Sequence, residues 1–287
     1  IESAGMTDKA YRQPSAVLNY QVALERIDKN PASVVNFRKQ RVTLKPKDSY
    51  LTTHECSLLL LEMSSIKAKQ PHLVKHLNIL LFTLLTGLRK SNVQTLKWSQ
   101  IKPDYDGNEL GLIVIEKTKN GDRYEMPLIP VMQSLLSEQK NHITSRKGLA
   151  KKDYGKIKDD CEYVFPNATC TGATNSPRVP LTTIFKKLGI NKTYRDHDLR
   201  RTFASLADLA GISFTDIKHL MVHRKKDITE LYMQSQQVKA KANYQQIFDL
   251  LASTVPYKQY TDENNEERTE FFRSDELQKL LFPSFGN

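Results

Sequence analysis

A histidine and an arginine three residues apart open one amphipathic segment of the sequence, HDLRRTFASLADLAGI, residues 197–212. Residues i and i+3 of a helix share a face, so His197 and Arg200 can address one ligand together. The pair suits a phosphate, because Arg is a permanent two-pronged donor and His donates or accepts a proton near neutral pH. A polar pair that only caps the helix explains this segment equally well. Arg201 points to another side, where we expect it to be solvated or in a salt bridge.

Three other stretches carry side chains suited to the same chemistry. Arg89 follows a glycine at a helix-to-helix corner, TGLRKSN, where a guanidinium can lie beside free backbone amides that favour an anion. The tip of an expected hairpin, KTKNGDRYEMP, holds Lys117 and Lys119, and LMVHRKKDITELYMQ places Tyr232 nine residues after His223. Each stretch taken alone has an ordinary explanation: a surface arginine at a turn, a solvated lysine, or a half-buried tyrosine.

The elements that must position these residues are mainly helical. Residues 9–28 have apolar positions at helical spacing, and Asn30-Pro31 breaks that helix. Thr52 and Glu55 form a capping-box pattern before an apolar run. Residues 71–86 are largely apolar, which predicts a buried helix that ends at Gly87.

A hairpin is expected within LGLIVIEKTKNGDRYEMPL, where two apolar segments flank Asn120-Gly121. From residue 130 onward the pattern is again mainly helical, with loops near 145–160 and 166–180. These elements predict an α+β fold that is mainly helical with a small sheet at the hairpin.

The composition favours a polyanionic partner. The 287 residues include 43 Lys and Arg against 32 Asp and Glu, a formal net charge of +11, and 39% of the residues are hydrophobic. A basic chain that can bury a sizeable core is typical of nucleic-acid-binding proteins. A basic enzyme with another substrate fits the charge equally well, so the charge alone leaves both classes open.

Cysteine usage and apolar runs restrict the classes further. Cys56, Cys161 and Cys170 are irregularly spaced, which predicts neither a disulfide framework nor a metal knuckle and favours a reducing interior over secretion. The most apolar run, LVKHLNILLFTLLTGL, contains Lys75 and His76 and is shorter than the ~20 apolar residues of a membrane span. We therefore expect a cytoplasmic protein without a membrane partner.

Taken together in chain order, the four stretches resemble the boxes of the tyrosine recombinase family, the phage-type integrases. HDLRRTFAS resembles the family's His-x-x-Arg box, TGLRKSNVQTLKWSQI the box of the first arginine, and TKNGDRYEMPL the lysine hairpin. The interval from His223 to Tyr232 also matches, and the resemblance extends from about Leu51 to Asp249. The catalytic residues that it implies are Arg89, Lys119, His197, Arg200, His223 and Tyr232.

The resemblance implies that DNA strands are cut and rejoined through a 3′-phosphotyrosyl intermediate. Arg89 and Arg200 would hold the non-bridging phosphate oxygens, with His223 as a further donor. Tyr232 would be the nucleophile, and His197 would assist the removal of its proton.

Lys119 would protonate the departing 5′-oxygen. Because the bond energy stays in the protein–DNA ester, the resemblance implies no cofactor and no metal. The implied setting is a bacterial host, with the chain encoded by the host or by a prophage.

A domain organisation is also implied. Residues 1–36 look like the end of a helical core-binding domain, most of which we expect to lie outside this chain, and residues 37–50 look like a basic linker. Residues 51–250 would be the catalytic domain, and residues 251–287 an acidic tail with a short helix, ELQKLLF. The implied partners are double-stranded DNA and other copies of the chain, in a tetramer on two DNA sites. The tail helix can pack on its own domain or on a neighbour.

Two positions depart from the family pattern. Val222 stands where members often have a glycine before the second histidine. Asn92 stands where many members have an acidic residue three after the first arginine, so it can orient a neighbour but brings no charge.

Other functions use parts of the same pattern. A type IB topoisomerase would share the chemistry without exchanging DNA partners, a DNA-binding regulator would not need Tyr232, and a nuclease of another class would need a metal. If Tyr232 is not the nucleophile, Tyr244 is the next tyrosine to consider.

Overall fold

The computed structural model describes residues 4–34, 49–103, 107, 111–116, 123–144, 161–175, 177, 181–190, 194–221, 234–261 and 267–283. Contacts divide the chain into two compact units, Ile1–Asp48 and Ser49–Asn287. Across these ranges, we find no helix with the length and apolar composition needed to cross a lipid bilayer.

In its described residues, the first unit contains a long helix, α1 (Ala4–Ala23), and a short 3-10 helix, η1 (Pro31–Val34). α1 ends earlier than the sequence pattern predicts, because the chain turns at Glu25, whose φ of 55° lies in the left-handed region. The Asn30 side chain then ties the returning segment to α1, donating to the Ser15 carbonyl at 3.0 Å and to Asn19 Oδ1 at 2.7 Å.

The second unit is mainly helical. Its helices in the described ranges are α3 (Thr53–Lys69), η2 (Pro71–Leu73), α4 (Val74–Thr86), α5 (Lys90–Gln94), η3 (Trp98–Gln100), α6 (Pro130–Thr144), α7 (Leu181–Lys187), α8 (Asp196–Leu209), α9 (Phe214–Leu220), α10 (Gln234–Ala252) and α11 (Ser274–Leu281).

A three-stranded antiparallel sheet accompanies these helices, in the order β1 (Ile101–Lys102), β2 (Leu112–Ile115) and β3 (Tyr124–Pro127). Ile113 pairs with Met126 and Ile115 with Tyr124, so β2 and β3 are the two strands expected around Asn120-Gly121. That turn lies outside the described residues. The expected α+β class, mainly helical with a small antiparallel sheet, is confirmed.

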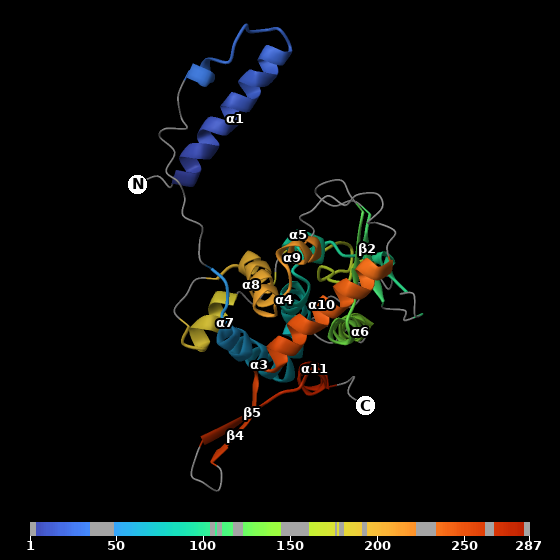
Figure 1. Ribbon diagram of the computed structural model, residues 1–287. Helices are drawn as coiled ribbons and strands as arrows, with labels where there is room; N and C mark the ends of the chain where they lie inside the picture. The colour runs from blue at the N-terminus through green and yellow to red at the C-terminus, as the bar shows by residue number, and fades with distance from the viewer. Residues whose placement is uncertain are drawn as a thin grey trace. The chain divides into compact units, whose positions relative to one another are not determined.

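A second hairpin, β4 (Pro256–Thr261) and β5 (Glu267–Phe271), follows α10. The sequence pattern had indicated only an acidic tail before the last helix, so this hairpin was not predicted. Figure 1 shows this hairpin extending away from the helices of its unit. Its aromatic side chains Tyr257 and Phe271 are exposed. None of the hairpin side chains whose burial is described is buried, so the pattern that makes a strand visible in a sequence is missing there.

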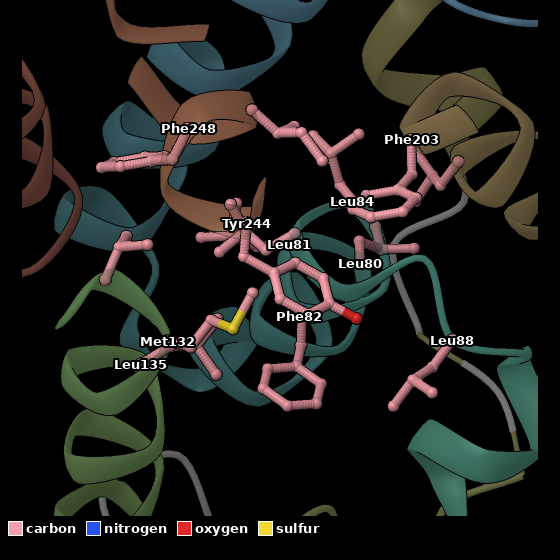
Figure 2. Packing of buried hydrophobic residues seen from close by; sticks show 14 of the residues in the cluster. Leu80, Leu81, Phe82, Leu84, Leu88, Met132, Leu135, Phe203, Tyr244 and Phe248 are labelled. Carbon is pink, nitrogen blue, oxygen red and sulfur yellow. The ribbon is translucent and has the colours of Figure 1, made fainter. Parts of the chain in front are cut away.

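The centre of the second unit is α4, and α6, α8 and α10 pack around it (Figure 1). Every residue of α4 except Lys75 is buried, which confirms the helix expected to be buried. Figure 2 shows Phe82 of α4 close to Met132 of α6 and to Tyr244, which reaches from α10 into the cluster.

The expected ends of two helices are confirmed. Thr52 and Glu55 form the capping box of α3: Thr52 Oγ1 accepts from the Glu55 amide at 3.2 Å, and Glu55 Oε2 accepts from the Thr52 amide at 2.9 Å. Gly87 ends α4 in the left-handed region with a φ of 62°. A Cβ at Gly87 would lie 2.3 Å from the Phe203 ring, so α8 can approach this corner only because no side chain is there.

The short apolar helix expected in the tail is α11, and it packs on its own chain. Leu277 and Leu281 of α11 are buried, as is Phe282 directly after it. Lys67 of α3 lies 4.2 Å from the centroid of the Phe282 ring and donates to Glu138 of α6 at 2.7 Å. Burial lowers the pKa of Lys67, and Glu138 opposes that shift.

The expectation that the cysteines form no disulfide was wrong. Cys161 and Cys170 are bonded, with Cα atoms 5.2 Å apart. The pairing depends on the loop fold: Tyr163 bridges to Lys97, and Pro166 bridges to Ala173, which turns the chain back between the two cysteines. Cysteine usage therefore no longer argues for a reducing compartment.

Candidate active site

Arg200 is the buried centre of the candidate site. It lies in the second turn of α8 with 2% of its surface exposed, and its guanidinium donates to the carbonyls of Gly87 and Met221. Gly87 is the C-cap of α4, and Met221 is the C-cap of α9. Helix C-termini carry partial negative charge and unpaired carbonyls, so two helix ends hold this cation in place.

Arg89 is the N-cap residue of α5, two residues after Gly87, and is half-buried. Burial, and next the positive charge of Arg89, lower the pKa of Arg200 to about 10. Arg200 therefore remains protonated at neutral pH, and the two cations lie close enough to repel each other. A bound anion would relieve that repulsion, so this corner favours a phosphate over a neutral ligand.

His197 lies in the first turn of α8 and is exposed. Its expected partner Arg200 is buried three residues later, so the two side chains differ in burial. The structure thus places the imidazole at the surface end of the helix and the guanidinium inside.

The other charges in this turn have structural roles. Asp198 caps the helix by accepting from the Arg195 amide at 2.8 Å, and it also accepts from Ser49 Oγ at 2.7 Å. Arg201 donates to Asp198 Oδ1 at 3.2 Å, which confirms the expected salt bridge. The charged residues at the start of α8 therefore have separate roles. The Arg200 side chain is buried, whereas Asp198 caps the helix and pairs with Arg201.

Lys119, His223 and Tyr232 lie outside the described residues. Described residues lie close to each of them in the chain. β3 begins at Tyr124, five residues after Lys119; the described part of the chain reaches Met221, two residues before His223; and α10 begins at Gln234, two residues after Tyr232. The proposed roles of these three residues stay predictions.

Tyr244 is not suited to be the alternative nucleophile considered above. Its side chain is buried with 1% exposure, its hydroxyl lies within the core, and burial raises its pKa well above the usual value. The structure also reveals Tyr124 beside it, at 3.4 Å between the two hydroxyl oxygens. Sequence reasoning missed this pair, since both residues lie in apolar patterns that indicate only core positions.

No group of three or more His, Cys, Asp or Glu side chains that could hold a metal ion occurs among the described residues.

The chain is similar in sequence to one family of known proteins and similar in fold to two of their solved structures. A sequence model of the phage integrase family matches residues 49–239. Tyrosine recombinase XerC of Lactobacillus leichmannii is 26% identical over 187 residues, which cover 64% of this chain and 58% of that protein.

Two solved structures share the fold. A lambda integrase dimer bound to a COC′ core site has a TM-score of 0.52 at 17% identity, covering 80% of this chain and 59% of that one. The Tn1549 transposon integrase in complex with circular intermediate DNA has a TM-score of 0.51 at 18% identity, covering 84% of this chain and 79% of that one. The chain thus spans less than two thirds of the length of XerC and of that lambda integrase chain.

Proposed function

The chain belongs to the phage integrase family, and from that premise we propose that it is a site-specific DNA recombinase that cuts and rejoins strands through a covalent 3′-phosphotyrosyl intermediate. One observation supports this most directly: Arg200 is buried at the ends of two helices, with the charge of Arg89 close by. A phosphodiester is already an anion and gains charge in the transition state, so two fixed cations are what its cleavage requires.

In the proposed reaction, the Tyr232 oxygen attacks the scissile phosphorus and forms a P–O bond. The P–O5′ bond breaks, and the 5′-oxygen leaves with the electron pair and takes a proton from Lys119. His197 assists the loss of the tyrosine proton, and His223 donates to a non-bridging oxygen.

Rejoining is the reverse reaction. The 5′-hydroxyl of another strand attacks the phosphotyrosyl ester, Tyr232 leaves, and the energy of the broken bond is retained in the new one. In these steps each bond that breaks is matched by one that forms, so the proposed reaction uses no cofactor and no nucleotide.

We assign double-stranded DNA and other copies of this chain as partners. The net charge of +11 suits a polyanion. Each active site holds one nucleophile and cuts one strand, so exchange between two duplexes calls for a tetramer. We place the reaction in the cytoplasm of a bacterial host, where chromosomal and mobile-element DNA meet.

The test is to capture a covalent complex in the presence of EDTA. The protein is incubated with a pool of nicked duplexes randomised around the nick, so that the short cleaved fragment diffuses away and the reaction cannot reverse. We expect a band that survives SDS, disappears after protease treatment and yields a preferred DNA sequence. Failure to trap any DNA would contradict the proposal. Relaxation of plasmids without strand exchange between duplexes would indicate a topoisomerase instead.

A further inference from the structure

Two buried tyrosine hydroxyls lie close to Arg200, at the ends of α4 and α9. Tyr124 Oη of β3 lies 3.1 Å from the Leu220 carbonyl oxygen. Tyr244 Oη of α10 lies 3.4 Å from the same oxygen and 3.5 Å from the Thr86 carbonyl oxygen. Figure 2 shows the Tyr244 ring entering the core from α10 with its oxygen at the far end.

The acceptors of these hydroxyls adjoin the acceptors of Arg200. Thr86 is the last residue of α4 and Gly87 its C-cap, while Leu220 is the last residue of α9 and Met221 its C-cap. Carbonyls in the last turn of a helix have no partner within the helix. Arg200 donates to the Gly87 and Met221 carbonyls. The tyrosine hydroxyls lie against the carbonyls one residue earlier, those of Thr86 and Leu220.

The available protons divide between these acceptors. Each phenol donates once, and the Tyr124 hydroxyl lies nearer to the Leu220 carbonyl oxygen than the Tyr244 hydroxyl does, at 3.1 Å against 3.4 Å. The Tyr244 proton then has three acceptors at 3.4–3.5 Å, namely the Thr86 and Leu220 carbonyls and the Tyr124 oxygen. A hydroxyl that can change partners joins the two helix ends and the strand into one network.

Both hydroxyls are protonated near neutral pH. Burial raises the pKa of Tyr124 to about 12 and the pKa of Tyr244 well above its usual value, and the charge of Arg200 opposes both shifts. The hydroxyls are therefore neutral hydrogen-bond donors near neutral pH.

Packing around the tyrosine hydroxyls links them to the candidate active site. The Phe203 ring, three residues after Arg200 on α8, lies 5.8 Å from the Tyr244 ring and closes against Gly87. Arg89 follows Gly87 by two residues, and His223 follows Met221 by two residues. A shift of either helix end would move the Arg200 acceptors and the start of a proposed catalytic segment together.

We propose that Tyr124 and Tyr244 are positioning residues for strand cleavage, whose hydroxyls hold the ends of α4 and α9 so that the Arg200 guanidinium meets the scissile phosphate. This inference rests on the proposed recombinase function. It differs from a purely stabilising role, in which loss of either hydroxyl would lower the melting temperature and leave the cleavage step unchanged.

The test compares Tyr124→Phe and Tyr244→Phe with Tyr194→Phe. Tyr194 is an equally buried tyrosine whose hydroxyl lies 3.1 Å from Glu55 Oε2, at the start of α3. Each variant loses one oxygen atom. Single-turnover cleavage is measured on the duplex sequence selected in the capture experiment, at a temperature well below the melting temperature of every variant. We expect cleavage to fall ~10-fold or more for Tyr124→Phe and Tyr244→Phe with little change in DNA affinity, and to stay near the wild-type rate for Tyr194→Phe.

A second substrate separates positioning from loosened structure. A methylphosphonate at the scissile position lacks one negative oxygen and needs less charge stabilisation, so a defect that acts through Arg200 should shrink on it. We expect the defects of Tyr124→Phe, Tyr244→Phe and the reference variant Arg200→Ala all to shrink there. Either tyrosine variant suffices if the other does not fold.

The outcomes are distinct for the two proposals. If Arg200→Ala abolishes cleavage while both tyrosine variants match Tyr194→Phe, the positioning role is wrong and the recombinase function stands. Defects of equal size on both substrates would also overturn the positioning role. If Arg200→Ala cleaves like the wild type, the proposed function itself fails.

Discussion

Arg200 is a buried cation whose guanidinium lies against two backbone carbonyls. A carbonyl is a dipole without net charge, so these two contacts orient the guanidinium without cancelling its positive charge. Arg89 adds a second cation at the same corner, and its charge lowers the pKa of Arg200. Under the proposed function, this pair of cations would stabilise the negative charge that develops in the transition state.

Replacement of either arginine should affect cleavage far more than binding. We expect Arg89→Ala and Arg200→Ala each to lower single-turnover cleavage by ~10²-fold or more, the effect typical of losing one preorganised donor, with only a modest loss of DNA affinity. Arg201→Ala is the matched control, because Arg201 is the next residue on α8 and pairs with Asp198. Equal losses in affinity and cleavage for Arg89→Ala and Arg200→Ala would mark them as plain phosphate contacts.

Lys119 should act on the leaving group alone. We expect Lys119→Ala to cleave ordinary DNA slowly and to recover substantially on a substrate with sulfur at the 5′-bridging position, since a thiolate leaves without needing a proton. Lys117→Ala is the control, because we expect two residues that are two apart on an extended strand to share a face. If sulfur substitution restores cleavage by Lys117→Ala and not by Lys119→Ala, the general acid is Lys117 and not Lys119.

At the scale of the elements, the corner between α4 and α5, against which α8 packs, positions both arginines. Gly87 has a left-handed φ, lies against the Phe203 ring and offers its carbonyl to Arg200. We expect Gly87→Ala to lower the free energy of unfolding by more than the ~1–2 kcal/mol that a left-handed alanine costs, because the new methyl group also displaces Phe203. Urea unfolding measures the loss, and the cleavage rate should fall with it.

Gly189→Ala separates the two causes. Gly189 has a φ of +70° with no atom within 4 Å of an added Cβ, so this variant carries the backbone cost alone. Equal destabilisation by the two variants would mean that the close approach of α8 to Gly87 contributes nothing.

The last helix can be tested in the same way. Leu281 of α11 is buried within its own chain, and we expect Leu281→Ala to lower the free energy of unfolding by ~2–5 kcal/mol. Lys279→Ala, on the exposed side of the same helix, should change it little. A stability unchanged by Leu281→Ala, measured at a concentration where the protein is monomeric, would show that α11 does not pack on its own domain in solution.

Elements with a strong local signal were predictable from the sequence. The capping box at Thr52, the glycine end of α4 and the buried character of that helix depend on neighbouring residues. The early end of α1, the hairpin of β4 and β5 and the Cys161–Cys170 bond were not predicted. They depend on side-chain contacts across a turn, on strands without a buried face and on how a loop folds back.

At the scale of the whole molecule, the candidate site was predictable only as a set of boxes in chain order. Phosphoryl transfer demands particular residue types, so Arg89 and Arg200 could be singled out, and the structure brings their charges together. Tyr124 and Tyr244 could not be singled out, because a tyrosine in an apolar pattern looks the same whether its hydroxyl joins a network or not. Their importance depends on packing between segments far apart in the sequence.

The most direct test of the central claim is to locate the DNA on the protein after capture. We expect mass spectrometry of the trapped complex to find the nucleotide remnant on Tyr232, and Tyr232→Phe to bind the same duplex with unchanged affinity and form no covalent complex. Undiminished capture by Tyr232→Phe, or a remnant on any other residue, would contradict the account.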